Sequence, residues 1–505
     1  MTPDTDNAAT TIDTPHIQTL LQRHEATTRP RLETLWSFYR NPMTTAPSDT
    51  ARGTAQRSTR VRLAQERGLP ERLTGPRDAA SDDRLPSSRE IVIENDIAWR
   101  IHTMVDFMFG RPVSIVSTAR DGQLRSRINA LLDSVWQDSG GVALLADIGL
   151  LGHVYGHVDL LVRADEVGRI RVEPIEPTRG IAILDPDDYR RIQAYAIRSS
   201  RVHIADARPA TSNLPPRGLT RWLAGPLSPR LFGSREQGPI ITELFTADAR
   251  RTFIQDKPDA AARLIDESPA LVRAGDDADA LGAPPIAHIQ NISQPFRYEG
   301  LSEVEPLIPL QNELNTRLSD RASRVTLQAF KMYLAKGLDG ISNMSVGPGQ
   351  VWCTDNPAAT IEAFGGDATS PSEDAHINEI REALDKASGV PPLASGVVRA
   401  KIGNLTSENA LRVTLMGLLS KTARKRVTYG RGLAEVSRLI LLAAHRAGIL
   451  STEPAHRGVR IEWPDPLPRP ESDALDAALK KIALGIPRER VLSELGYAPT
   501  DPGIV

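Results

Sequence analysis

The second half of the chain is dominated by apolar residues that recur at helical spacing. Ser302 and Glu305 form a capping-box pattern, and the apolar face that follows predicts a helix to about Leu334. Spanning roughly 30 residues, this helix would be ~50 Å long. Pro309 lies in its first turns and is expected to kink it. The face consists of Val304, Leu307, Ile308, Gln311, Leu314, Leu318, Ala322 and Val325.

Two further helices are predicted after this one. Ser370-Pro371-Ser372-Glu373 combines a capping box with proline at the first helical position and predicts a helix to Ser388. Opposite its apolar stripe, the helix carries an acidic face formed by Asp374, Glu382 and Asp385. The third helix is predicted from Thr406 to about Ala447, with bends expected at Gly417, Gly430 and Gly432.

The first half has mixed periodicity and predicts an α+β unit. Helical spacing covers residues 16–40, 94–110 and 124–151, and strand-like runs follow at 153–163, 169–175, 191–198 and 242–254. Residues 205–239 are dense in Pro, Arg, Gly and Ser, which is typical of a long surface loop or insertion. The fold class expected for the whole chain is therefore α+β, mainly α.

Composition narrows the class of protein. The chain has 505 residues, a formal net charge of -2 and a single cysteine, Cys353. The single cysteine excludes a disulfide framework or a multi-cysteine metal site, and it favours a soluble protein in a reducing, intracellular setting. The start lacks a signal-peptide pattern, and no apolar run is long enough to span a bilayer. The near-neutral charge argues against nonspecific DNA coating, but it allows a channel through which DNA slides.

The sequence contains no recognised catalytic motif. There is no phosphate-binding loop, zinc-protease motif, nucleophile elbow or dinucleotide fingerprint. The best metal candidates are His153, His157 and Asp159, which would share one face of a strand. Polar residues on a solvated or subunit-contact face are the simpler interpretation. A second candidate site for a hard cation consists of Asp185, Asp187 and Asp188. Their sequence, Asp-Pro-Asp-Asp, is first of all typical of a turn.

Basic residues gather on two of the predicted helices and in the loop between the second and third. Arg317, Arg321 and Arg324 lie beside the apolar face of the first long helix, where a solvated face or inter-subunit ion pairing is the usual interpretation. Arg399 and Lys401 instead lie in the Gly- and Val-rich loop between two long helices, where contacts to phosphates are possible.

The order of these parts resembles that of tailed-bacteriophage portal proteins of the siphophage type. The similarity runs from about Leu32 to Pro499 and lies in collinear order rather than in one sharp motif. Its strongest part is the sequence around residues 289–315, which resembles the start of a portal stem helix. The other matching segments are 35–40 (LWSFYR), 106–113 (DFMFGRPV), 150–156 (LLGHVYG) and 388–392 (SGVPP).

The resemblance implies a portal fold with an α/β wing, long stem helices, a small β-containing clip, a kinked spine helix and a small helical crown. It divides the chain into an N-terminal polar arm with one helix (1–90), the wing (91–300, with the 205–239 insertion), stem helix 1 (301–334), the clip (335–370), stem helix 2 (371–388), the tunnel loop (389–404), the spine helix (405–447) and the crown (448–505).

By the same resemblance, the chain forms a homo-oligomeric ring, usually a dodecamer, at one capsid vertex of the virion, assembled in the host cytoplasm. Double-stranded DNA would pass through it during packaging and ejection. Arg399 and Lys401 would contact this DNA, and the acidic face of stem helix 2 would line the channel and repel phosphates. The implied partners are the major capsid protein, the terminase large subunit and a head-completion or adaptor protein. No enzymatic activity, cofactor, metal or membrane is implied.

Trp352, on a strand-like segment of the clip, is the candidate contact for terminase and head-completion proteins, although a buried strand tryptophan is an equal alternative. Two other functions remain open. One is a metal-dependent nucleic-acid-processing enzyme built around His153, His157 and Asp159. The other is a head-completion or scaffold-like structural protein that binds a ring without forming one.

Overall fold

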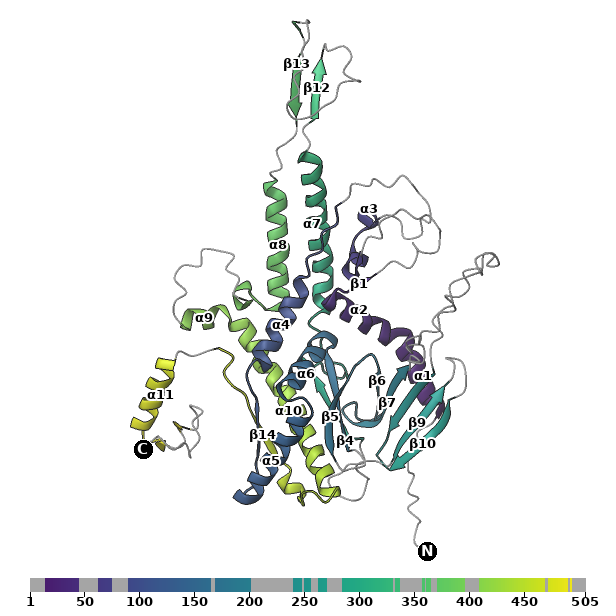
Figure 1. The fold of residues 1–505 in the computed structure, drawn as a ribbon, viewed down its shortest axis with the longest axis vertical. Coiled ribbons are helices and arrows are strands. Elements are labelled where there is room, and N and C mark those ends of the chain that lie inside the picture. The colour runs from purple at the N-terminus through teal and green to yellow at the C-terminus, as the bar shows by residue number, and fades with distance from the viewer. Residues whose placement is uncertain are drawn as a thin grey trace, which may run out of the picture.

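A computed structural model defines the fold of the chain. It describes residues 14–44, 62–74, 90–164, 169–200, 239–247, 249–255, 262–269, 284–329, 332–336, 357–358, 360–364, 370–395, 408–467, 471–488 and 491–492. The insertion 205–239 therefore falls almost entirely outside the described residues, as do the tunnel-loop and clip residues Arg399, Lys401 and Trp352. Figure 1 shows a mixed body from which a long helical hairpin projects. The described chain is α+β and mainly α, as the sequence predicts.

The N-terminal helix is continuous, as expected, but one part of it is π-helical. It comprises α1 (Thr14–Arg23), a π-helical turn (His24–Thr28) and α2 (Arg29–Arg40). Asn41 ends it in the left-handed conformation, with φ 46°. Short elements follow in the described chain: β1 (Met43–Thr44), β2 (Arg62–Leu63), a 3-10 turn (Ala64–Gly68) and α3 (Glu71–Thr74).

The body contains three helices between residues 96 and 155. The helix α4 (Asp96–Phe109) is confirmed, and the Asn95 side chain caps it by accepting the Ala98 N–H. The single helix expected over 124–151 is wrong, because the chain forms α5 (Gly122–Asp138) and α6 (Gly141–Tyr155). Gly140 separates them with φ 123°, a conformation that favours glycine.

The strands form separate antiparallel sheets. A three-stranded sheet has the order β11-β4-β5, and a five-stranded sheet has the order β10-β9-β8-β7-β6. A small pair joins β14 to β3. The strands are β3 (Ser114–Ser117), β4 (His157–Ala164), β5 (Ile170–Ile175), β6 (Gly180–Leu184), β7 (Ile192–Ser200), β8 (Ile240–Phe245), β9 (Ala249–Gln255), β10 (Arg263–Pro269), β11 (Ile286–Gln290) and β14 (Val459–Glu462).

The projecting hairpin contains α7 (Ile308–Ala329) and α8 (Pro371–Ser388), with the strand pair β12 (Met332–Lys336) and β13 (Thr360–Phe364) at its far end (Figure 1). The helix expected to reach Leu334 instead ends at Ala329. Pro309 is its second residue, where proline is tolerated, so the kink expected there is not formed. Ser302 Oγ accepts the N–H groups of Val304 and Glu305 and so caps the 3-10 turn Glu305–Leu307 that precedes α7.

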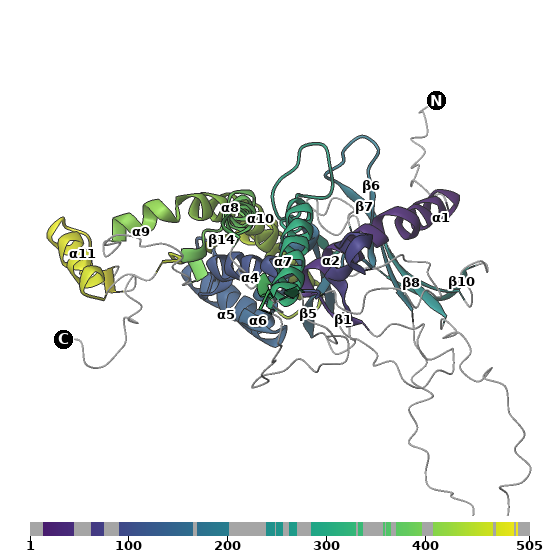
Figure 2. The same cartoon turned by 90° about the horizontal axis from the view of Figure 1, so that it is seen from above.

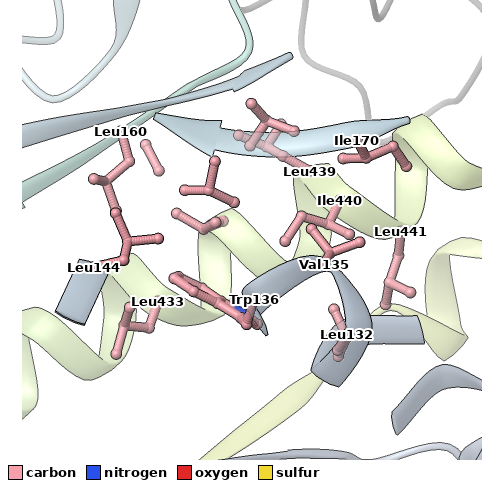
Figure 3. Packing of buried hydrophobic residues seen from close by; sticks show 14 of the residues in the cluster. Leu132, Val135, Trp136, Leu144, Leu160, Ile170, Leu433, Leu439, Ile440 and Leu441 are labelled. Carbon is pink, nitrogen blue, oxygen red and sulfur yellow. The ribbon is translucent and has the colours of Figure 1, made fainter. Parts of the chain in front are cut away.

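The C-terminal part packs its longest helix into the body. The third helix is interrupted once, at Leu415, which separates α9 (Glu408–Thr414) from α10 (Met416–Arg446). The apolar side of α10, including Leu433, Leu439 and Ile440, packs against α5, α6 and the three-stranded sheet (Figure 3). A 3-10 turn (Pro392–Ser395), another (Pro454–His456) and α11 (Glu471–Ala483) complete the described elements. Within the described residues, none of the helices has the length and apolar character needed to cross a bilayer.

Candidate functional site

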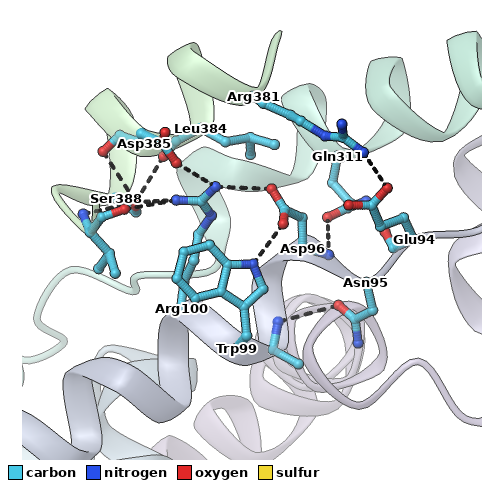
Figure 4. A network of polar contacts seen from close by, with 12 residues as sticks. Glu94, Asn95, Asp96, Trp99, Arg100, Gln311, Arg381, Leu384, Asp385 and Ser388 are labelled. Carbon is cyan, nitrogen blue, oxygen red and sulfur yellow. Dashed lines mark hydrogen bonds and ion pairs between the residues drawn. The ribbon is translucent and has the colours of Figure 1, made fainter. Parts of the chain in front are cut away.

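Arg100 forms the centre of a buried polar network at the base of the hairpin (Figure 4). It lies in α4 and its side chain is fully buried. The guanidinium forms ion pairs with Asp96 of its own helix at 2.9 Å and with Asp385 of α8 at 2.7 Å. It also donates hydrogen bonds to Ser388 Oγ at 3.1 Å and to the Val390 carbonyl oxygen at 3.0 Å.

This network holds the end of α8 against α4. A buried charge is tolerated only when it is paired and hydrogen-bonded, and Arg100 meets both conditions. Its guanidinium also lies 4.4 Å from the centre of the Trp99 ring, whose Nε1–H donates to Asp96. Because Ser388 and Val390 flank the end of α8, Arg100 fixes the point at which the chain leaves the hairpin. We refer to Asp96, Arg100, Asp385, Ser388 and Val390 as the arginine clamp.

A second buried cluster joins the start of the hairpin to α10. Glu303, which is 3% exposed, lies 2.7 Å from Lys425 Nζ and 2.5 Å from Lys421 Nζ. Lys421 Nζ also donates to the Ser388 carbonyl oxygen at 2.7 Å. Lys421 of α10 therefore binds both Glu303, in the segment that precedes α7, and Ser388, the last residue of α8. We refer to Glu303, Lys421 and Lys425 as the lysine cluster.

Burial and charge act in opposite directions within the lysine cluster. Burial would raise the pKa of the Glu303 carboxyl, but Lys425 and Lys421 overcome it and lower this pKa to about 2. Burial lowers the pKa of Lys425 to about 8, and the attraction of Glu303 opposes part of this change. At neutral pH, Glu303 is therefore ionised and lies beside the ammonium group of Lys425.

A ladder of polar side chains on α7 binds the extended segment before α4. The N–H groups of residues 90, 92, 94 and 96 each donate to one such side chain, at 3.0 to 3.1 Å. Four residues of helix rise about 6 Å, close to the ~6.6 Å of two extended residues, so the two repeats match. The four acceptors are Ser323, Ser319, Asn315 and Gln311.

This polar ladder corrects the sequence interpretation of α7. Gln311 was assigned to an apolar face, but it is fully buried and accepts the Asp96 N–H. Asn315 and Ser319 are equally buried. The i, i+4 spacing of the four polar residues is a signal present in the sequence, but its partner segment lies more than 200 residues earlier and gives no matching pattern.

The basic residues of α7 pair with acidic residues nearby. Arg321 lies 3.0 Å from Asp374 of α8, and Arg324 forms an ion pair with Glu373. Arg317 pairs with Glu313 of its own helix at 2.7 Å. Exposed pairs of this kind contribute little stability, but those between helices define which faces of α7 and α8 meet.

The predicted acidic face of α8 is divided by the structure. Asp374 and Glu382 are exposed, whereas Asp385 turns inward and belongs to the arginine clamp. The acidic residues thus occupy two different environments on one helix. Three other predicted site residues lie outside the described residues: Arg399, Lys401 and Trp352.

The metal site considered for His153, His157 and Asp159 is not formed. His153 is the thirteenth residue of α6 rather than part of a strand, and its Nδ1 faces the Gly149 carbonyl oxygen at 2.6 Å. Gly156, with φ 91°, ends α6, so β4 begins only at His157. In the described chain, no group of three or more His, Cys, Asp or Glu side chains is arranged to hold a metal ion.

Asp159 is instead the acceptor of a buried network. The hydroxyls of Tyr195 and Tyr298 donate to it at 2.6 and 2.7 Å, and His288 Nδ1 lies 2.6 Å away. Burial would raise the pKa of Asp159, but His288 is the main cause that lowers it to about 2. These contacts join β4, β7 and β11, so the network connects the two larger sheets.

The second cation candidate is a turn. Asp185 accepts the Asp187 N–H at 3.0 Å, and Asp188 accepts the Arg190 N–H at the same distance. Asp185 also forms an ion pair with Arg191 at 3.6 Å. The carboxylates therefore hold the turn between β6 and β7, as their sequence pattern indicates.

Comparison with known proteins shows the family to which the chain belongs. Residues 245–497, just over half of the chain, match the family described as "Phage portal protein, SPP1 Gp6-like". The chain therefore belongs to the phage portal protein family, whose members are head-tail connectors. No curated protein matches its sequence.

Two solved structures are similar to this chain. One comes from the "Virion of native gene transfer agent (GTA) particle", with 12% identity, a TM-score of 0.42 and coverage of 80% of this chain and 89% of that chain. The other comes from the "Neck of empty GTA particle computed with C6 symmetry", with 14% identity, a TM-score of 0.45 and coverage of 84% and 95%. The family assignment rests on the sequence match over residues 245–497.

Proposed function

We propose that this chain forms the ring-shaped channel at one capsid vertex, through which double-stranded DNA is packaged and later ejected. Membership of the portal family supports a structural, connector role. The observation that carries the proposal further is the hairpin of α7 and α8. It projects from the body and is held at its base by two buried charged networks.

The portal regions follow from this assignment. In the proposal, α7 and α8 are the stem helices, β12 and β13 belong to the clip at 335–370, and the body from 91 to 300 is the wing. α9 and α10 form the spine helix, interrupted at Leu415, and α11 belongs to the crown. The 1–90 arm and the tunnel loop at 389–404 complete the division. The clip, including Trp352, is the surface proposed for terminase and the head-completion protein.

The shape of the hairpin supports the proposal that the chain forms a ring. Two helices bury only the faces that meet, so a hairpin projecting from its own body leaves its other faces for neighbouring subunits. Head-to-tail contacts that close produce a ring, which we propose to be a dodecamer bound to the major capsid protein at the capsid vertex of the virion. Assembly in the host cytoplasm is part of the same proposal.

The arginine clamp and the lysine cluster have a specific place in this function. Both bind Ser388, the last residue of α8, immediately before the proposed tunnel loop. Residues of the wing helix α4 and of the spine helix α10 therefore both hydrogen-bond to Ser388. We infer that the start of the tunnel loop is held rigidly to the wing and spine, so that a movement of either reaches the loop.

DNA is proposed to slide past acidic and basic groups that differ in role. Glu382, exposed on α8, would repel phosphates along the channel, whereas the exposed Asp374 is paired with Arg321 and would repel them less. Arg399 and Lys401 would provide sparse contacts at the constriction. Asp385 is assigned to the clamp rather than to the channel wall, since its carboxylate pairs with Arg100.

The experiment that tests this division is a packaging assay with the double variant Arg399→Ala/Lys401→Ala. We expect rings of normal mass that package or retain less DNA. The matched control, Arg125→Ala/Arg127→Ala, removes the same charge from exposed positions of α5 and should package normally. Equal packaging by the two variants would refute the role of the loop residues.

The enzyme alternative gains no support from the described residues, because its three candidate ligands do not converge. A structural protein that binds a ring without forming one would be distinguished from a portal by the mass of the purified particles.

A further inference from the structure

The spine helix carries a stripe of exposed, largely apolar residues that the described part of the chain leaves uncovered. Val413, at the end of α9, and Met416 and Val427, on α10, are 69%, 65% and 65% exposed. Ser420 and Ala423 are also exposed and lie between them. The five positions are spaced by three and four residues, which places the last four along one side of α10, with Val413 in α9 just before the interruption at Leu415. We call them the spine stripe.

The exposure of the spine stripe contrasts with the burial of the opposite side of α10. The opposite side of α10 is part of the main core, where Leu433, Val436 and Ile440 are completely buried. Large exposed apolar side chains in a row mark an interaction surface more often than chance exposure does. The spacing of three and four residues is that of helices that pack side by side.

A second uncovered stripe of the same kind lies on α11. Leu475, Leu479 and Ile482 are 46%, 65% and 38% exposed, and their spacing of four and three residues also places them on one side of the helix. Figure 2 shows α9 and α11 together at the side of the molecule away from the five-stranded sheet. We call these three residues the crown stripe.

The two stripes are matched in chemistry as well as in spacing. Arg424 and Arg431, both exposed, border the spine stripe, whereas the exposed Asp476 borders the crown stripe. A basic edge beside one apolar row and an acidic residue beside the other favour contact between the two. Within one chain they do not cover each other, because both remain exposed.

We propose that the crown stripe of one subunit packs on the spine stripe of its neighbour in the ring. A head-to-tail contact needs two different surfaces on one chain, and these stripes supply them. The occupant of the spine stripe is thus a second copy of this chain. This inference rests on the ring proposed above, and it names which helices form one of its subunit contacts.

Disulfide trapping tests the contact directly. Cys353 is the only cysteine, so the background variant is Cys353→Ser, into which Met416→Cys and Leu479→Cys are introduced together. Residues that face each other across packed helices come within the distance that a disulfide requires. After oxidation, we expect a ladder of disulfide-linked oligomers on a non-reducing gel. Mixing the two single-cysteine variants should give linked dimers and nothing larger.

The control pair combines Met416→Cys with Ile265→Cys, which is 50% exposed on β10, and should give no ladder. Particle mass measured on the same samples separates the possible failures. A closed ring without the ladder, or with a disulfide only within one chain, would refute the stripe contact and leave the portal proposal standing. A chain that stays monomeric at every concentration and gives no ladder would refute both.

Discussion

Replacing Arg100 with methionine tests whether the arginine clamp holds the hairpin to the body. The variant keeps an unbranched side chain of similar length but removes the cation that pairs with both Asp96 and Asp385. It also removes the donor to the Val390 carbonyl oxygen and one of the two donors to Ser388 Oγ, which still accepts the Val390 N–H. Removing one partner of a buried ion pair typically costs about 3–5 kcal/mol, because the other partner remains buried and unpaired.

The position of Asp385 sets where in this range the loss should fall. Its side chain is 20% exposed, so water can partly solvate it, whereas that of Asp96 is 3% exposed. We therefore expect a loss near the lower end, about 3 kcal/mol. Arg100→Lys keeps the charge but not the forked geometry that reaches four acceptors, and should lose about 1–2 kcal/mol.

The assay is urea unfolding followed by tryptophan fluorescence, to which Trp99, one of six tryptophans, contributes from a ring whose centre lies 4.4 Å from the Arg100 guanidinium. The control, Arg317→Met, removes an exposed cation that pairs with exposed Glu313 and with Asp320, which keeps its ion pair with Arg72, and should lose less than about 1 kcal/mol. A loss in Arg100→Met no larger than in this control would refute the view that the clamp stabilises the hairpin base.

Two further predictions concern the lysine cluster and the polar ladder. Glu303 has a folded-state pKa of about 2, below its ordinary 4.5, so its contribution to stability is present above pH 4.5 and is lost as pH falls toward 2. In Glu303→Gln, the free energy of unfolding should fall less steeply across that window, and an unchanged slope would contradict the assignment. Asn315→Ala removes the acceptor of the part-buried Glu94 N–H, together with the bonds of Asn315 to Gln311 and Gln65, and should cost about 1–3 kcal/mol, with faster amide exchange in peptides covering residues 90–96. Ser323→Ala, at the exposed end of the ladder, is its control, and equal exchange in the two variants would count against the ladder.

Features that depend on local sequence were predictable. The bounds of α8 follow from Ser370 and Pro371 at its start and Gly389 at its end, although Ser370 forms no side-chain cap and Glu373 pairs with Arg324. The helix α4 follows equally from its apolar spacing and its Asn95 cap. In both cases, the signal and the structure it produces lie within a few residues of each other.

Features that depend on distant partners were not predictable. The clamp joins Arg100 to residues almost 300 positions later, and nothing near Arg100 distinguishes it from an exposed arginine. The same limit explains the error at His153, where the apolar run before Gly156 fits either a strand or a buried helix. The residues proposed for DNA and partner contact, Arg399, Lys401 and Trp352, remain sequence predictions.

Electron microscopy of the purified protein, with its mass measured by light scattering, tests the portal function most directly. The account predicts a closed ring with an open axial channel, and a mass of roughly 660 kDa for twelve copies of the 55.1 kDa chain. Particles that bind a separate ring without closing into one, or a monomer that persists both alone and in the presence of capsid protein, would contradict it.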